Sequence, residues 1–175
     1  MGTRALTQWF PTRWRARHLL MGAALLAGCQ SAEARSGLTN TRGSAEDVAQ
    51  AVLDAVAAKD RPALEALMVS EAEHRDLLFD QLPESHTWPF PFVRDLNMRN
   101  SMKGLGRTLK RYGGMQFELL AIEFTKDTEV YDGFALHRGA VLRVKRLSDG
   151  REGTLRILDV MVERNGRWKL MNYEE

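Results

Sequence analysis

Apolar side chains recur at helical spacing in the part of the chain that follows residue 43. Ser44, a residue type that commonly caps helices, precedes the first such stretch. The apolar positions of this stretch lie three or four residues apart: Val48, Val52, Ala55 and Val56. This spacing predicts an amphipathic helix that starts at Ser44 and ends before Asp60.

Three further helix starts follow along the chain. Asp60-Arg61-Pro62 places a proline in the first turn of a second helix, and Ser70 with Glu73 forms a capping box before a third. The segment 86–92, rich in proline and aromatic residues, is predicted as a connection. A longer helix is predicted over 94–112, with one apolar face: Met98, Met102, Leu105, Leu109 and Tyr112.

The hydrophobic period changes to two after Gly113-Gly114, which indicates β-strands. The alternation predicts four strands: 117–124, 131–146, 154–164 and 167–173. Asp149-Gly150 and Asn165-Gly166 are typical hairpin turns between neighbouring strands. We therefore expect an α+β protein in which N-terminal helices precede an antiparallel sheet of about four strands.

The first 28 residues differ from the rest of the chain. A basic stretch without acidic residues leads into an apolar run over 19–27, which is too short to span a bilayer. Leu26-Ala27-Gly28-Cys29 then resembles the lipobox of bacterial lipoproteins. The resemblance implies cleavage between Gly28 and Cys29 and lipidation of Cys29. An uncleaved anchor and an ordinary buried cysteine are the alternatives.

The lipobox resemblance also implies a place for the protein and a division of the chain. It implies a lipid-anchored protein of the bacterial cell envelope. The residue after Cys29 is Gln30 and not the aspartate that resembles an inner-membrane retention signal. We therefore expect the protein on the periplasmic side of the outer membrane. Residues 1–28 are then the signal peptide, 29–43 a flexible tether rich in small and polar residues, and 44–175 the folded domain.

The composition is typical of a globular protein, with 44% hydrophobic and 27% charged residues among 175. Because Cys29 is the only cysteine, an intramolecular disulfide and a cysteine-cluster zinc site are excluded. Removal of the four arginines in residues 1–28 leaves 21 basic and 23 acidic residues, so the formal charge changes from +2 to −2. We therefore expect no nucleic-acid partner, which would favour a basic domain.

The order of helices and strands resembles the nuclear transport factor 2-like, or ketosteroid isomerase-like, family of cone-shaped domains. The resemblance also rests on the link 58–64 and on the hairpin 163–170 with its Gly-x-Trp-x-Leu ending. It implies that helices pack into the concave face of a strongly curved sheet. Members include enzymes, binding modules and assembly domains, so the family implies no single function. A similarity to uncharacterised bacterial lipoproteins of this class involves Asn97, Ser101, Tyr112 and Gly113, and it implies no activity either.

The Asn165-Gly166 turn predicts which strand residues face each other. A two-residue loop places Met161 opposite Leu170 and Asp159 opposite Asn172, all on the concave face. The other face keeps an apolar patch: Val141, Leu158, Val160, Val162 and Met171. An exposed apolar patch is typical of a partner surface, which makes a homodimer one expectation. Cover by the C-terminus or by a neighbouring loop is the other.

Asp159 is the candidate catalytic residue because it is an acid in a strand that is otherwise apolar. A desolvated carboxylate there would have a raised pKa and could act as a general acid or base. The alternative is a structural aspartate that bonds to Asn172 or to the backbone. His86 and Trp88 are candidates to line a cavity mouth with Tyr112, or simply to cover the end of the core.

No metal site or cofactor is expected, since no pair of histidines has metal-ligand spacing. The helix 94–112 has a basic side, which is either a solvated face or a site for an anionic ligand or lipid headgroup: Lys103, Arg107, Lys110 and Arg111. The sequence favours a lipid-anchored envelope protein whose domain binds a small-molecule or peptide ligand, or assembles with partners, without catalysis. The alternative is an isomerase- or dehydratase-like enzyme that uses the inward carboxylate.

Overall fold

The computed structural model describes residues 37–174, and Cys29 with the rest of the predicted leader lies outside them. Helices occupy the first part of this region: α2 (Ala45–Ala58), α3 (Arg61–Ala66), α4 (Glu71–Glu73) and α5 (Phe90–Tyr112). Between α4 and α5 the chain forms a π-helical turn and two 3-10 turns: η1 (His74–Leu78), η2 (Phe79–Gln81) and η3 (Pro83–His86). The predicted α+β class, with helices before strands, is confirmed.

The predicted starts of the first three helices are confirmed by their caps. Ser44 accepts a hydrogen bond from the backbone N–H of Asp47 at 3.1 Å. Ser70 and Glu73 form the complete capping box. Helix α5 starts at Phe90 and not at residue 94 as predicted, because Pro89 caps it and a proline in the first turn of a helix removes no helical hydrogen bond.

The prediction of about four strands is wrong, because two of the expected strands are interrupted. The structure has a sheet of order β1-β4-β5 and a sheet of order β2-β3-β6-β7. Their strands are β1 (Phe117–Phe124), β2 (Glu129–Tyr131), β3 (Phe134–Arg138), β4 (Ala140–Arg146), β5 (Glu152–Leu155), β6 (Leu158–Arg164) and β7 (Arg167–Tyr173). Gly139, with a φ of 68°, separates β3 from β4, so the expected strand 131–146 contributes to both sheets.

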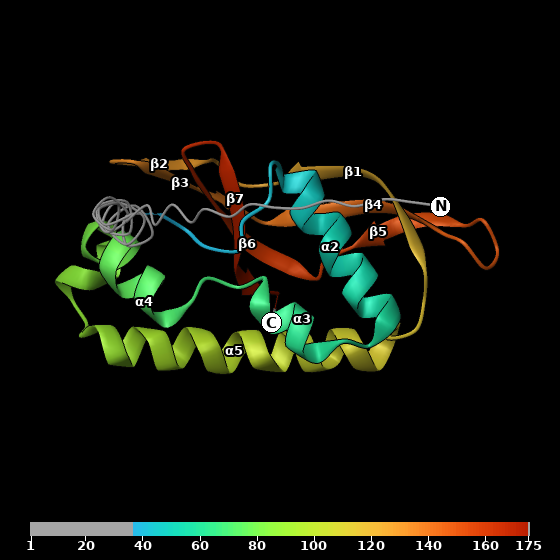
Figure 1. Cartoon of the computed structure of the whole chain (residues 1–175), viewed down its shortest axis with the longest axis horizontal. Coiled ribbons are helices and arrows are strands. Elements are labelled where there is room, and N and C mark those ends of the chain that lie inside the picture. Colours follow the sequence, from blue (N-terminus) through green and yellow to red (C-terminus); the bar gives the residue numbers. More distant parts are fainter. Residues whose placement is uncertain (1–36, 175) are drawn as a thin grey trace, which may run out of the picture.

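The main core lies between the helices and the sheet residues that face them. Helix α2 packs against β1 and β7, and α5 packs against β7. In Figure 1, α5 runs lengthwise along the side of the molecule opposite β1 and β4. Met161 and Leu170, predicted to face inward, belong to this core, which confirms their orientation. Four other apolar strand residues belong to it as well: Leu142, Val144, Leu155 and Ile157.

The predicted pairing of Met161 with Leu170 is confirmed, whereas that of Asp159 with Asn172 is wrong. The register shifts between Leu158 and Val160, so Val160 lies opposite Asn172 and Asp159 has no partner in β7. Such a β-bulge bends the strand and interrupts the alternation of its side chains. As a result Leu158, predicted on the outer face, is buried in the main core.

The predicted dimer patch is not exposed. Val160, Val162 and Met171 form a second core cluster with Leu78, Leu82 and Val69 of the segment that leads into α5. Val141 and Leu158 are buried as well. The five residues are therefore buried within one chain and not exposed as predicted, and cover by a neighbouring loop is confirmed for three of them. The homodimer itself stays a prediction.

The described part of the expected tether contacts the domain. Arg42 and Trp168 exchange two backbone hydrogen bonds of 2.9 Å, and Leu38 packs on the second cluster. Residues 38–42, which fall within the predicted tether, are therefore attached to the domain by these contacts. Two residues between α3 and α4 bond to β7 in a similar way. The N–H of Val69 donates to the carbonyl of Leu170, and the N–H of Leu170 donates to the carbonyl of Leu67.

Candidate functional site

The structure does not bring the predicted cavity residues together. His86 and Trp88 precede α5 and are exposed, whereas Tyr112 is the last residue of that helix. With 23 residues, the helix separates its two ends by about 33 Å. The ring of Trp88 packs against that of Phe92, with 5.0 Å between centroids. The predicted cluster of His86, Trp88 and Tyr112 is therefore wrong.

Asp159 occupies the β-bulge and is half-buried. Its backbone carbonyl accepts a hydrogen bond of 2.8 Å from the N–H of Gly139. Asn172, its expected partner, instead accepts a 3.5 Å hydrogen bond from the hydroxyl of Ser101 on α5. Asp159 does not line the groove described next, and its observed role is to join β6 to the Gly139 junction.

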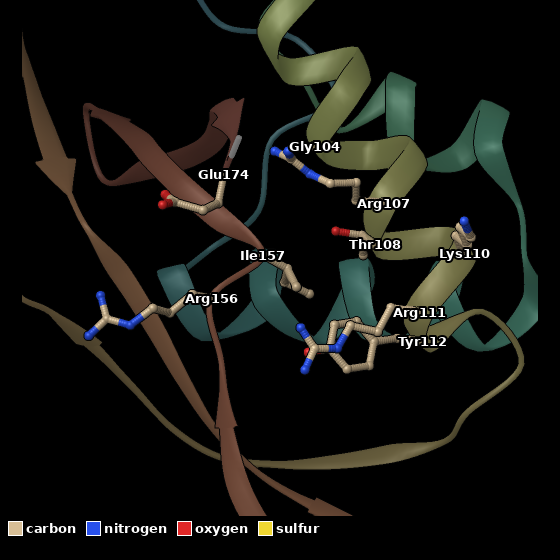
Figure 2. A pocket seen from close by; sticks show the side chains of 9 residues that line it. All are labelled: Gly104, Arg107, Thr108, Lys110, Arg111, Tyr112, Arg156, Ile157 and Glu174. Atoms are coloured by element: carbon tan, nitrogen blue, oxygen red, sulfur yellow. The ribbon is translucent and has the colours of Figure 1, made fainter.

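A groove of about 500 Å³ runs beside the C-terminal half of α5 (Figure 2). Its lining includes four cationic side chains and one carboxylate. Helix α5, the link between β5 and β6, and the residue after β7 contribute the lining: Gly104, Arg107, Thr108, Lys110, Arg111, Tyr112, Arg156, Ile157 and Glu174. In Figure 2 the side chains of Arg107 and Arg111 lie on either side of that of Ile157, whereas the guanidinium of Arg156 points away from it.

Helical spacing and a close backbone approach build the groove. Gly104, Thr108 and Arg111 follow one another at steps of four and three residues, so they lie on the same side of α5. A Cβ on Gly104 would lie 2.0 Å from the carbonyl oxygen of Glu174, so only glycine lets the C-terminal segment cross the helix here. The N–H of Glu174 also donates to the carbonyl of Ile157 at 3.2 Å. This contact joins the C-terminal segment to the β5–β6 link.

The groove combines a positive rim with an apolar floor. Arg107, Arg111 and Arg156 are exposed, whereas Ile157 is 2% exposed. The guanidinium of Arg111 also lies 5.3 Å from the ring centre of Tyr112, which restricts its position. Planar guanidinium groups bind carboxylates and phosphates through paired hydrogen bonds. The arrangement is therefore suited to an anionic group that carries an apolar portion.

The sequence predicts part of this groove. The basic side of the helix 94–112 supplies Arg107, Lys110 and Arg111, and Tyr112 was a candidate cavity residue. Strand alternation across 154–164 would place Arg156 on the outer sheet face, but it lies in the β5–β6 link and lines the groove. Its role could not be found from strand alternation, because the break between β5 and β6 changes its direction.

Lys169 of β7 forms a buried ion pair with Glu73. Its ammonium lies 2.7 Å and 3.0 Å from the two carboxylate oxygens, and both side chains are buried. Glu73 also accepts from the Thr39 hydroxyl at 2.9 Å and from the backbone N–H of Ser70 at 2.7 Å. Burial alone would raise the pKa of Glu73, but Lys169 and the N–H groups of Thr39 and Ser70 outweigh it and lower the pKa to about 2. The pair thus joins residue 39, α4 and β7.

His74, the residue after Glu73, is also buried. Its ring lies edge-on to those of Phe79 and Phe90, at 6.1 Å and 5.3 Å. Among the described residues, its Nε2 has no hydrogen-bond partner. Burial, together with the positive charge of Arg94, lowers the pKa of His74 to about 4. The imidazole is therefore neutral at pH 7.

No family model matches the chain, and no curated protein or solved structure is significantly similar to it. Within residues 37–174, no three His, Cys, Asp or Glu side chains form a group that could hold a metal ion. The helices of this same region include none with the length and apolar character needed to cross a membrane.

Proposed function

We propose that this chain is a lipid-anchored protein of the bacterial cell envelope whose domain binds an anionic ligand without catalysis. The lipobox at residues 26–29 supports the anchor. The groove beside α5 supports the ligand, because Arg107 and Arg111 on the helix flank the apolar floor at Ile157, and Arg156 of the β5–β6 link also lines the groove. A carboxylate- or phosphate-bearing small molecule, or an acidic peptide end, has the matching chemistry.

The presence of cations from two elements, α5 and the β5–β6 link, in the lining of one groove is the observation that carries the binding proposal. The C-terminal end of a helix repels anions through its dipole, so the side chains themselves must provide the attraction. Glu174 is the one acid in the lining, and it lies at the side where the chain crosses Gly104. The enzyme alternative gains no comparable support, because His86 and Tyr112 lie at opposite ends of α5 and Asp159 is not part of the groove lining.

We also propose that the domain is a variant of the nuclear transport factor 2-like cone. The order of helices before strands and the packing of α2 and α5 on the inner sheet residues support this proposal. A cone of this family places its helices on the concave side of a curved sheet. In this chain the groove would then lie at the edge of the cone, between α5 and the β5–β6 link.

Replacement of both Arg107 and Arg111 by Gln is expected to weaken binding of hexyl phosphate by about tenfold or more, since each charged hydrogen bond contributes about 1.5–3 kcal/mol before screening by salt. Titration calorimetry on the purified protein measures the affinity. Arg143→Gln is the matched control, because Arg143 is an exposed strand arginine outside the groove lining. Unchanged affinity in the double variant, or equal binding of neutral hexanol, would contradict the proposal.

The anchor has its own test in the living bacterium. Replacement of Cys29 by Ser is expected to abolish incorporation of radioactive palmitate, because the thiol is the atom to which the lipid is attached. Gln30→Ala, one residue further along, is the control and is expected to keep the label. Labelled protein in the Cys29→Ser strain would show that the lipobox resemblance is misleading.

A further inference from the structure

Three large apolar side chains form an exposed stripe at the start of α5. Trp88, Phe92 and Leu96 are 51%, 50% and 42% exposed and are spaced by four residues. Trp88 and Phe92 are in ring contact at 5.0 Å, and Leu96 lies one helical turn beyond Phe92 on the same side of α5, so the three residues form one group and are not scattered. Single exposed apolar residues are ordinary on a protein surface, whereas a continuous group of them indicates a contact surface.

The side of α5 that carries this apolar stripe continues with cations. At 100° per residue, the helix positions of Phe92, Leu96 and three basic residues fall within a sector of about 60°. These basic residues are exposed: Arg99, Lys103 and Lys110. The whole helix contains six Lys and Arg residues and a single acid, Asp95. An apolar section followed by a basic section on one helix side is typical of helices that lie on anionic bilayers.

The position of residue 37 places the stripe close to the predicted lipid anchor. Thr39 bonds to Glu73, and the adjacent His74 packs against Phe90, which lies between Trp88 and Phe92 in the chain. Figure 1 shows the start of the described chain passing near α4, at the end of the molecule where α5 begins. Cys29 is eight residues before Gly37, so the lipidated residue lies within about 28 Å of Gly37.

We propose that the Trp88–Phe92–Leu96 stripe inserts into the headgroup region of an anionic phospholipid bilayer, and that α5 lies along the bilayer surface. This inference rests on the proposed lipid anchor for the local presence of the membrane. Trp and Phe bury their rings at the boundary of headgroups and acyl chains, while the cations of the same helix side contact lipid phosphates. The anchor and the stripe together then fix the orientation of the domain, which a single attachment point would leave free.

A single-tryptophan experiment on the full chain tests the contact. One variant keeps only Trp88, with Trp9, Trp14 and Trp168 replaced by Phe, and its partner keeps only Trp168. Both are bound to vesicles of phosphatidylglycerol and bromine-labelled phosphatidylcholine, in which bromine quenches nearby indole rings. We expect Trp88 to be quenched roughly threefold more than Trp168, which is half-buried and stacked on Phe124.

Matched variants assign the quenching to the stripe. Phe92→Ser with Leu96→Ser is expected to reduce quenching of Trp88 to the level of Trp168. Met115→Ser with Leu120→Ser removes two other exposed apolar residues, 37% and 38% exposed, and is expected to leave it unchanged. Vesicles of phosphatidylcholine alone are expected to give weaker quenching, and equal quenching without anionic lipid would overturn the role of the cations.

Other results would overturn the inference and leave the anchor proposal standing. One such result is a protein whose mass shows a lipidated Cys29 but in which Trp88 is no more quenched than Trp168. It would overturn the bilayer contact of the stripe and leave the anchor standing. A blue shift of Trp88 that grows with protein concentration without vesicles points to a second copy of the chain as the occupant, and also overturns it. Conversely, a Cys29 that carries no lipid would refute the anchor. Strong quenching of Trp88 in that protein would still support the bilayer contact.

Discussion

Replacement of Lys169 by Met is expected to destabilise the protein by about 3–5 kcal/mol, because it leaves the Glu73 carboxylate buried without its cation. Lys169 and Glu73 are 3% and 6% exposed, so water does not replace the missing charge. The remaining donors to Glu73, from Thr39 and Ser70, are insufficient compensation for a buried negative charge. Urea unfolding followed by circular dichroism measures the loss.

The double variant Glu73→Gln with Lys169→Met is the control for this prediction. Gln has no charge but still accepts the hydrogen bond from Ser70, so we expect it to recover much of the stability lost in Lys169→Met. The two single variants and the double variant together give the coupling energy, which is expected to exceed about 1 kcal/mol. Additive effects of the two substitutions would show that the ion pair does not stabilise the fold.

Acidification from pH 6.5 to pH 4 is expected to lower the free energy of unfolding by roughly 3 kcal/mol through His74. The pKa of His74 is lowered from 6.5 to about 4 in the folded protein. The unfolded chain therefore binds a proton in this range that the folded chain does not bind, and stability falls as the pH falls. Glu73 affects stability at lower pH, because its pKa is lowered from 4.5 to about 2 in the folded protein. Its stabilising contribution is present above pH 4.5 and is lost as the pH falls toward 2.

Denaturant titrations at several pH values, with His74→Gln beside the unmodified protein, separate the two groups. Gln does not titrate, so the variant is expected to show little change in stability between pH 6.5 and pH 4, whatever its stability at pH 7. Below pH 4 both proteins are expected to lose stability as Glu73 takes up a proton. The same slope in both proteins between pH 6.5 and pH 4 would show that His74 is not the responsible group.

Local signals in the sequence predict the elements well. Ser44 and the Ser70–Glu73 box were recognisable as caps because their hydrogen bonds form within three residues. The turn at Asn165-Gly166 fixed the pairing of Met161 with Leu170 for the same reason. Alternation alone could not reveal the bulge at Asp159, since a bulge inserts a residue without altering the hydrophobic pattern around it.

Contacts between distant segments account for what could not be predicted. The outer sheet face looked exposed because the segment over 74–86 has no regular period, yet it supplies Leu78 and Leu82 as cover. Similarly, the partner of Lys169 is Glu73, which is 96 residues away in sequence. No local pattern could therefore predict that this lysine is buried. In the groove, the basic helix side was predictable, whereas the contribution of Arg156 depends on a strand break.

The two short bridges on β7 bear on how this protein avoids aggregation. β7 is the outermost strand of its sheet, and an unpaired outermost strand can recruit a strand from another molecule. Here the backbone groups of Trp168 and Leu170 are already bonded to Arg42 and to Leu67 and Val69. Strand addition at this edge would have to displace both segments. The C-terminal strand is thus protected, and intermolecular strand pairing is left to the edges at β1, β2 and β5.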